Sequence, residues 1–167
     1  GGGNGVALLS GGLRNEAGGT IFGGDGGAGG VNASGSTANG RPGNGGSGGD
    51  GVAATVTGQT IYNAGSITGG AGGAGATSVN AEANGLSGAG GVGVRLAGDG
   101  NLLVNAGNIV GGQSGDGAVR ANAVSITGNA NVLELNAGYG FTGNVVATGT
   151  GNALRLGGTS NASFDVT

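Results

Sequence analysis

NAGSITGG at residues 63–70 and NAGNIVGG at residues 105–112 decide the fold, because the same phrase returns after a short apolar run. A looser copy, NAGYGFTG, begins at Asn136, and an expanded copy, NEAGGTIFGG, begins at Asn15. The distance between copies varies because of glycine-rich stretches that follow the phrase. A unit of fixed length with insertions of variable length is typical of a solenoid, in which each copy forms one coil stacked on the next.

Apolar residues alternate with other residues within each copy, as Val94 and Leu96 or Leu133 and Leu135 do. A period of two indicates strands rather than helices. Glycine recurs every few residues, and each glycine inside a helix would cost about 1 kcal/mol. Short strands with glycine or asparagine corners, and one turn in roughly 20 to 25 residues, predict an all-β parallel β-helix.

We expect residues 1–167 to form a single solenoid segment of a larger protein. The predicted coils are residues 5–24, 51–70, 91–112, 118–143 and 144–167. The predicted insertions, all at one corner, are residues 25–50, 71–90 and 113–117. We expect these insertions to be flexible surface loops, and the alternative is extended polyglycine strands that lie against the solenoid.

The recurring asparagine is predicted to have a structural role at the corner. Asparagine tolerates left-handed backbone geometry, and its amide can satisfy backbone groups at a tight turn. Equivalent asparagines of successive coils are therefore expected to form an amide ladder, made of Asn15, Asn63, Asn105 and Asn136. The glycine two residues further on is expected to supply a positive φ at Gly65, Gly107 and Gly138.

Composition argues against catalysis and against nucleic-acid binding. The 167 residues include 49 glycines and no histidine or cysteine, and five arginines face eight acidic residues. Lysine is also absent, so the usual bases that activate a nucleophile are missing. A basic stripe with interleaved aromatic residues is missing too. We therefore expect no enzyme activity, no catalytic residue, no cofactor and no nucleic-acid partner, and no apolar run is long enough to span a membrane.

Most aspartates precede glycine, which favours a turn-forming role. These aspartates are Asp25, Asp50, Asp99 and Asp116. One of them has an alternative reading, because residues 45–53, GGSGGDGVA, fit the nonapeptide of calcium-binding β-rolls. No second nonapeptide follows it, so Asp50 remains only a candidate calcium ligand.

The phrase N-A-G-x-I-x-G-G, preceded by a coil that contains Gly-Val, resembles the passenger domains of Gram-negative type V autotransporters, especially glycine-rich adhesin-like members. Residues 131–166, NVLELNAGYGFTGNVVATGTGNALRLGGTSNASFDV, resemble the passenger segment just before the translocator. The resemblance implies a right-handed parallel β-helix that is exported and displayed on the cell surface, outside the outer membrane. The absence of cysteine agrees with export of this kind.

The function expected from this resemblance is that of a structural and interaction module, serving as a stalk or an adhesive surface. Its partner would be a ligand on a host or neighbouring cell, or a second copy of the chain. Recognition is expected from the insertions, because loops on a rigid scaffold usually carry it. The candidate contact residues are Arg14, Arg41, Arg95, Arg120 and Arg155. The alternatives are a calcium-binding β-roll-like module and a fragment of a polysaccharide-active β-helix enzyme.

Overall fold

The computed structural model describes residues 1–31, 41–79 and 83–159. These residues form fourteen strands of three or four residues each and no helix. Every strand pairs in parallel with the equivalent strand of a neighbouring coil. The predicted parallel β-helix is therefore confirmed.

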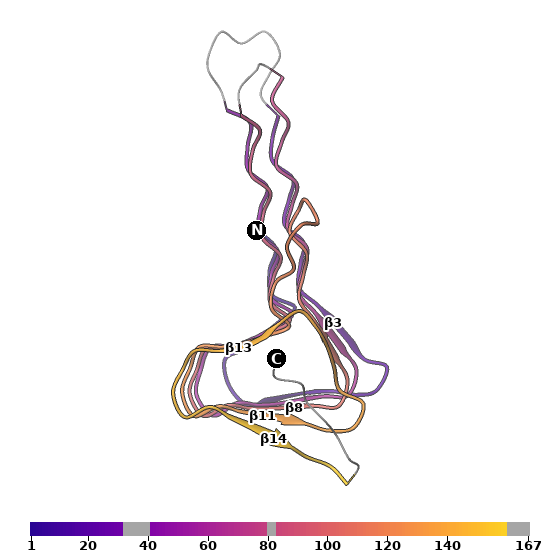
Figure 1. Ribbon diagram of the computed structural model, residues 1–167, viewed down its shortest axis with the longest axis vertical. Coiled ribbons are helices and arrows are strands. Elements are labelled where there is room, and N and C mark those ends of the chain that lie inside the picture. Colours follow the sequence, from indigo (N-terminus) through magenta and orange to yellow (C-terminus); the bar gives the residue numbers. More distant parts are fainter. Residues whose placement is uncertain (32–40, 80–82, 160–167) are drawn as a thin grey trace.

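Three sheets form the sides of a triangular body, which Figure 1 shows from one end of the solenoid. The first sheet contains β1 (Val6–Leu8), β4 (Val52–Ala54), β7 (Val94–Leu96), β10 (Val124–Ile126) and β13 (Val145–Ala147). The second contains β2 (Gly12–Asn15), β5 (Thr60–Asn63), β8 (Leu102–Asn105), β11 (Val132–Leu135) and β14 (Ala153–Leu156). The third contains β3 (Thr20–Phe22), β6 (Ser66–Thr68), β9 (Asn108–Val110) and β12 (Gly140–Thr142).

The predicted coil ranges each enclose one set of strands. Three strands lie within each of the first four ranges, whereas β13 and β14 lie within residues 144–167. The end of that last range, residues 160–167, lies outside the described residues.

The core of the body is a set of stacked apolar columns. Strand alternation turns every second side chain inward, so that Ile61, Leu103 and Leu133 form one column on the second sheet. Ile67 and Ile109 form another on the third sheet. Each of these side chains is buried, with at most 3% of its surface exposed. Burial of apolar surface, at about 25 cal/mol per Å², is the main force that stacks these coils.

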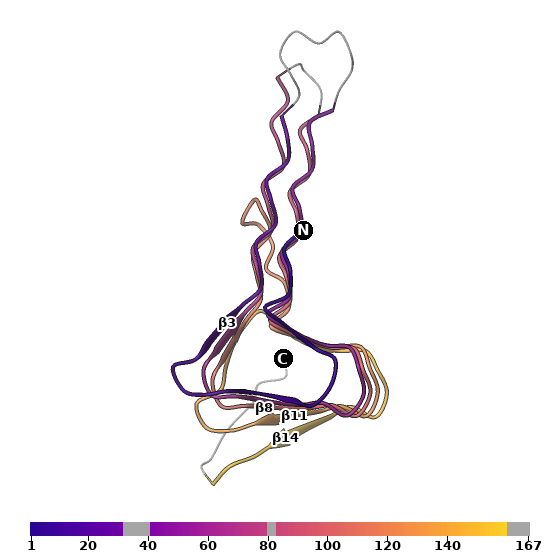
Figure 2. The ribbon, with the colours of Figure 1, turned by 180° about the vertical axis from the view of Figure 1, so that it is seen from behind.

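A long narrow extension projects from one corner of the body, between the third and the first sheet (Figures 1 and 2). We call it the blade. Its outgoing layer consists of residues 23–30, 69–76 and 111–115. Its return layer consists of residues 1–5, 43–51, 85–93 and 119–123. The blade contains most of the predicted insertions, and it places the turn of the third, shorter insertion part-way along its length (Figure 1).

The described residues contain no helix with the length and apolar character that crossing a bilayer requires.

Candidate interaction surface

Backbone hydrogen bonds repeat every three residues along the blade. In the outgoing layer, the N–H groups of Gly23, Gly26 and Gly29 donate to the backbone carbonyls of the next coil. The acceptors are Thr68, Ala71 and Ala74, each at 2.8 Å. A spacing of three residues matches the polyproline II helix, which has three residues per turn and no internal hydrogen bonds. Such helices must find all their backbone partners in neighbouring segments, and the two layers of the blade provide them.

The sequence of the blade follows this period as Gly-Gly-X. The first glycine donates to the X carbonyl of the next coil in the same layer, as Gly72 donates to Gln113 at 2.8 Å. The second glycine donates across the layers to another second glycine, as Gly73 donates to Gly46 at 2.8 Å. Most X side chains, such as those of Ser47, Ala71 and Ala74, are exposed. The blade therefore has a hydrogen-bonded backbone interior and a surface made of X side chains.

Glycine is required at interior positions such as Gly73 and Gly72, because the neighbouring backbone leaves no room for a side chain there. A Cβ atom on Gly73 would lie 2.0 Å from the carbonyl oxygen of Gly27. A Cβ on Gly72 would lie 2.0 Å from the carbonyl oxygen of Gly88. The expectation of flexible loops is thus wrong for the described parts of the insertions, which are extended and hydrogen-bonded to one another. They also differ from the alternative, because they project from the body rather than lie against it (Figure 1).

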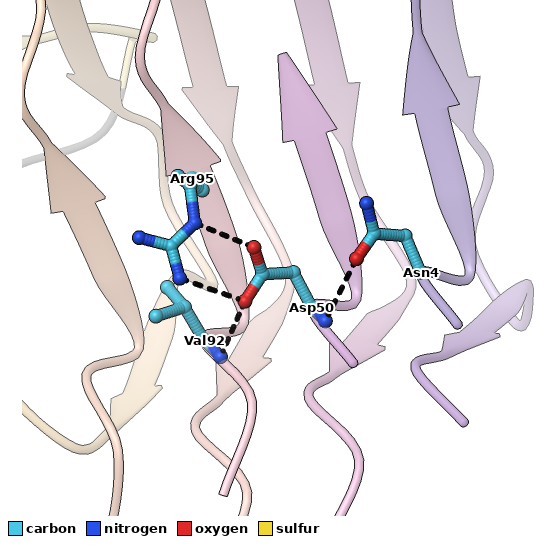
Figure 3. A network of polar contacts seen from close by, with 4 residues as sticks. All are labelled: Asn4, Asp50, Val92 and Arg95. Atoms are coloured by element: carbon cyan, nitrogen blue, oxygen red, sulfur yellow. Dashed lines mark hydrogen bonds and ion pairs between the residues drawn. The ribbon is translucent and has the colours of Figure 1, made fainter. Parts of the chain in front are cut away.

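Asparagine and aspartate at X positions link successive coils along the outside of the blade. Figure 3 shows one such chain, in which Asp50 donates its N–H to the Asn4 side-chain oxygen at 3.1 Å. The Asp50 carboxylate then accepts the N–H of Val92 at 2.9 Å. Asp25 and Asn44 accept backbone N–H groups of the next coil in the same way, at 2.7 and 2.8 Å. These side chains satisfy the X-position N–H groups, which the glycine pattern leaves free.

Asp50 also forms an ion pair at the base of the blade. The guanidinium of Arg95 donates to both carboxylate oxygens, at 2.5 and 3.0 Å, from the outer face of β7 (Figure 3). This hydrogen bond raises the pKa of Arg95 above its ordinary value. Asp50 thus ties the blade to the first sheet, and both of its carboxylate oxygens are engaged by Arg95.

The predicted asparagine ladder exists over three coils. Asn15 donates its amide to the Asn63 side-chain oxygen at 2.8 Å, and Asn63 donates to Asn105 at 2.8 Å. All three are buried, with 6% or less of their surface exposed. Their amides also reach the backbone at the corner, where Asn63 donates to the carbonyl of Asn108 at 3.3 Å.

Asn136 does not belong to this ladder, so the prediction is wrong for the fourth coil. The register of β11 places Leu135, and not Asn136, opposite Asn105. The amide nitrogen of Asn105 consequently has no hydrogen-bond partner within the described residues. Alignment on the letters NAG shifted the fourth coil by one residue relative to its strand pairing.

A second internal ladder was not predicted. It begins where the N–H of Gln59 donates to the Asn101 side-chain oxygen at 2.6 Å. Asn101 then donates its N–H to Asn131, and Asn131 to Asn152, at 2.8 Å in both cases. Each of these asparagines stands directly before a strand of the second sheet. The recurring pair of an asparagine and an apolar residue before leucine, in NLL, NVL and NAL, is the signal that could have revealed it.

Two expectations about corner geometry need correction. Gly138 has the predicted positive φ of 93°, but Gly65 and Gly107 do not. These two are glycine because a Cβ atom would lie 2.2 Å from a carbonyl oxygen of the preceding coil.

Of the aspartates that precede glycine, two stand at turns and two do not. Gly100 and Gly117 have positive φ values of 63° and 72°. Their neighbours Asp99 and Asp116 are therefore the turn residues that the sequence predicted. Asp25 and Asp50, in contrast, are X residues of the extended blade.

Most of the candidate arginines are engaged within the molecule. Arg14 pairs with Glu16 and lies over the Tyr62 ring at 4.2 Å, and Arg155 pairs with Glu134 at 3.2 Å. Arg120 donates to the carbonyl of Gly111 at 2.7 Å. Arg41 lies near the end of the blade, beside Pro42 and Asn44. Arg41 is exposed and forms no ion pair with the residues that the structure describes.

A groove of about 500 Å³ follows the angle between the blade and the third sheet. Its floor consists of glycine backbone from three successive coils, residues 23–24, 69–70 and 111–112. Phe22, which is 63% exposed, lies along it, together with Asp25, Gln113 and Arg120. The groove combines an aromatic face with polar groups of both charges.

The described acidic residues do not gather into one site. No group of three or more histidine, cysteine, aspartate or glutamate residues is placed to hold a metal ion within the described ranges. Comparison of the chain with protein-family models, with curated proteins and with solved structures gave no match.

Proposed function

We propose that this chain is a structural and interaction module whose β-helical body acts as a stalk and whose blade acts as an adhesive surface. The observation that carries the proposal is the blade itself. Its backbone is hydrogen-bonded between coils and between layers, so its X residues are held at regular intervals along an element that projects far from the body (Figure 1). A rigid, extended element that presents ordered side chains suits recognition, because little conformational entropy is lost on contact.

The proposed setting is the outside of a Gram-negative cell, where the chain would form part of an autotransporter passenger. The resemblance of the repeat phrase supports this setting, together with the parallel β-helix and the absence of cysteine. Its partner would be a surface ligand of a host or neighbouring cell, or another copy of the chain. A reading frame of the parent gene without a C-terminal set of amphipathic strands would contradict the autotransporter assignment.

The adhesive role is tested with beads coated with the purified chain. In a trimmed variant, the first two insertions are shortened to the turn that closes the third insertion, at residues 114–117. The body needs no long insertion, because β12 and β13 are joined without one. Full-length coating should make the beads clump or adhere to cells, and the trimmed coating should not. Equal adhesion by both, with equal β-structure by circular dichroism, would contradict the role of the blade.

The calcium and polysaccharide-enzyme alternatives lack a specific supporting observation in the described residues. Asp50, the candidate calcium ligand, is engaged by Arg95 and Val92. A melting curve measured with calcium and then with a chelator separates a calcium module from an adhesive one.

A further inference from the structure

The third insertion is shorter than the other two, and it closes as a hairpin part-way along the blade. Gln113 and Arg120 form an antiparallel bridge. Ser114 donates its N–H to the carbonyl of Val119 at 2.7 Å. The Asp116 carboxylate closes the turn by accepting the Ser114 hydroxyl at 2.5 Å and the Ala118 N–H at 3.0 Å. The return segment of this insertion therefore leaves the path that the longer return segments follow.

This departure leaves backbone groups of the second insertion without the partners that the blade pattern supplies. Ala121 still matches Gly91, because each donates its N–H across the layers at 2.8 Å. Two residues earlier, Val119 corresponds to Ala89 and would accept the N–H of Gly90, but its carbonyl accepts from Ser114 instead. The N–H groups of Gly90 and of Ser87, three residues earlier, have no hydrogen bond within the described part of the chain.

The carbonyl of Gly115 also accepts no backbone hydrogen bond from the residues that the structure describes. In the pattern of the return layer, residue 118 would donate to the carbonyl of Gly115, but Ala118 donates to Asp116 instead. The vacated position is a notch of about 420 Å³, whose walls include Leu86, Val119 and Asp116. Leu86 and Val119 are 73% and 66% exposed at its edges.

We propose that this notch binds an extended glycine-rich peptide of Gly-Gly-X sequence, as one additional polyproline II helix of the return layer. Ser87 and Gly90 are three residues apart, which is one turn of such a helix, about 9 Å. Their two N–H groups are therefore spaced to donate to the carbonyls of two successive X residues in the peptide. The N–H of the second glycine in a Gly-Gly-X unit of the peptide donates to the carbonyl of Gly115. Addition of an extended segment to an unpaired edge is an established mode of peptide recognition.

The neighbouring blade explains why the second position of the peptide must carry a very small residue, and glycine best of all. A Cβ at the equivalent residues Gly91 and Gly88 would lie 1.9 and 2.0 Å from a carbonyl oxygen. The blade itself carries alanine at two such positions, Ala76 and Ala121, so the same contact excludes a branched side chain such as valine rather than a single methyl group. The site does not depend on display at a cell surface, so its failure and that of the proposed function are distinguishable.

The test is a titration of the ¹⁵N-labelled chain with a (Gly-Gly-Ala)₃ peptide, followed by NMR. The amide signals of Ser87 and Gly90 should shift, and their hydrogen exchange should slow by about tenfold or more. A (Gly-Val-Ala)₃ peptide, with a branched side chain at the second position, is the matched control and should leave both signals unchanged. Shifts that are absent, or equal for the two peptides, would overturn the proposal.

A pair of proline variants locates the site. Ser87→Pro removes the N–H but keeps the extended backbone, and it should weaken peptide binding by about tenfold. Ala28→Pro makes the same change at an exposed X residue of the first insertion and should leave binding unchanged. Equal binding by both variants would overturn the assignment to the notch. Self-association of the chain that protects the same two amides would overturn it in favour of a second copy as the occupant.

Discussion

The body and the blade stack the same coils in the same order. Side-chain packing stabilises the body, whereas backbone hydrogen bonds stabilise the blade. The body buries columns of isoleucine, leucine and valine between its sheets. The interior of the blade consists mainly of glycine backbone, and its layers are joined by N–H to carbonyl bonds of 2.7 to 3.0 Å. Repetition can thus build a solenoid from side-chain packing or from backbone hydrogen bonds. The two regions should respond to substitution in opposite ways.

The largest effect is expected in the body, for Leu103→Ala. Leu103 is fully buried within its column, and truncation of a buried leucine costs about 2–5 kcal/mol. The neighbouring Leu102 lies on the outer, half-buried face of the same strand, so Leu102→Ala should cost clearly less. Urea unfolding followed by circular dichroism measures both. Equal losses would show that the inward column is not the source of stability.

The next largest effect is expected in the blade, where adding a methyl group should be harmful. In Gly73→Ala the new Cβ lies 2.0 Å from the Gly27 carbonyl oxygen, and overpacking of this kind costs about 1–3 kcal/mol. Hydrogen exchange of the Gly46 and Gly88 amides should accelerate, while the melting of the body changes little. Ala74→Ser, at the adjacent exposed X residue, is the matched control and should change neither. Slow exchange retained in Gly73→Ala would mean that the layers separate easily.

The sequence predicted the body better than the blade. Alternation of apolar residues identifies strands such as β7 and β11, because each inward position needs a large side chain. The Gly-Gly-X period was visible in residues 69–74, but glycine-rich composition also fits a flexible chain. Only the contact between two distant insertions makes each glycine necessary. That contact, between Gly73 and Gly46 for example, is not written in either segment alone.

The asparagine ladder shows a similar limit at single-residue scale. The recurring phrase correctly placed Asn15, Asn63 and Asn105 in register. It failed at Asn136 because strand pairing, and not the residue types of the repeat phrase, sets the register of the coil. Counting from Asn131, which occupies the place of Asn101, would have put Leu135 opposite Asn105. The notch beside Ser87 was equally beyond prediction, because it arises from a difference in length between two insertions.

The ladder gives an intermediate prediction. Asn63→Ala removes one acceptor of the Asn15 amide and one donor to the Asn105 oxygen. These groups keep only longer bonds to the backbone, such as those to Ser66 and Gly107, at 3.2 and 3.3 Å. Each net hydrogen bond lost costs about 0.5–1.5 kcal/mol. Asn136→Ala changes the same letter of the repeat phrase outside the ladder and should cost less. Thermal unfolding of the two variants compares them, and an equal loss would contradict a stabilising role for the ladder.

The smallest effect is expected at the hairpin of the third insertion, as pH falls. Hydrogen bonds from the Ser114 hydroxyl and the Ala118 N–H lower the pKa of Asp116 from its ordinary value of 3.8. Because the folded hairpin favours the carboxylate, its contribution is present above the unfolded pKa and is lost as pH falls through the lower, folded pKa. The amide signals of Ala118 and Val119 should therefore move toward those of an open turn only below the ordinary titration range of aspartate.

Asp116→Asn is the control for this titration. It keeps an oxygen that accepts hydrogen bonds but removes the ionisable group, so the amide signals of Ala118 and Val119 should no longer depend on acid pH. The glycine amides of the first two insertions, such as Gly26 and Gly46, have backbone partners and should be insensitive to acid in both proteins. If they titrated together with Ala118, the hairpin would be coupled to the whole blade. The short insertion, held by side-chain hydrogen bonds, would then not differ from the long insertions, held by backbone hydrogen bonds.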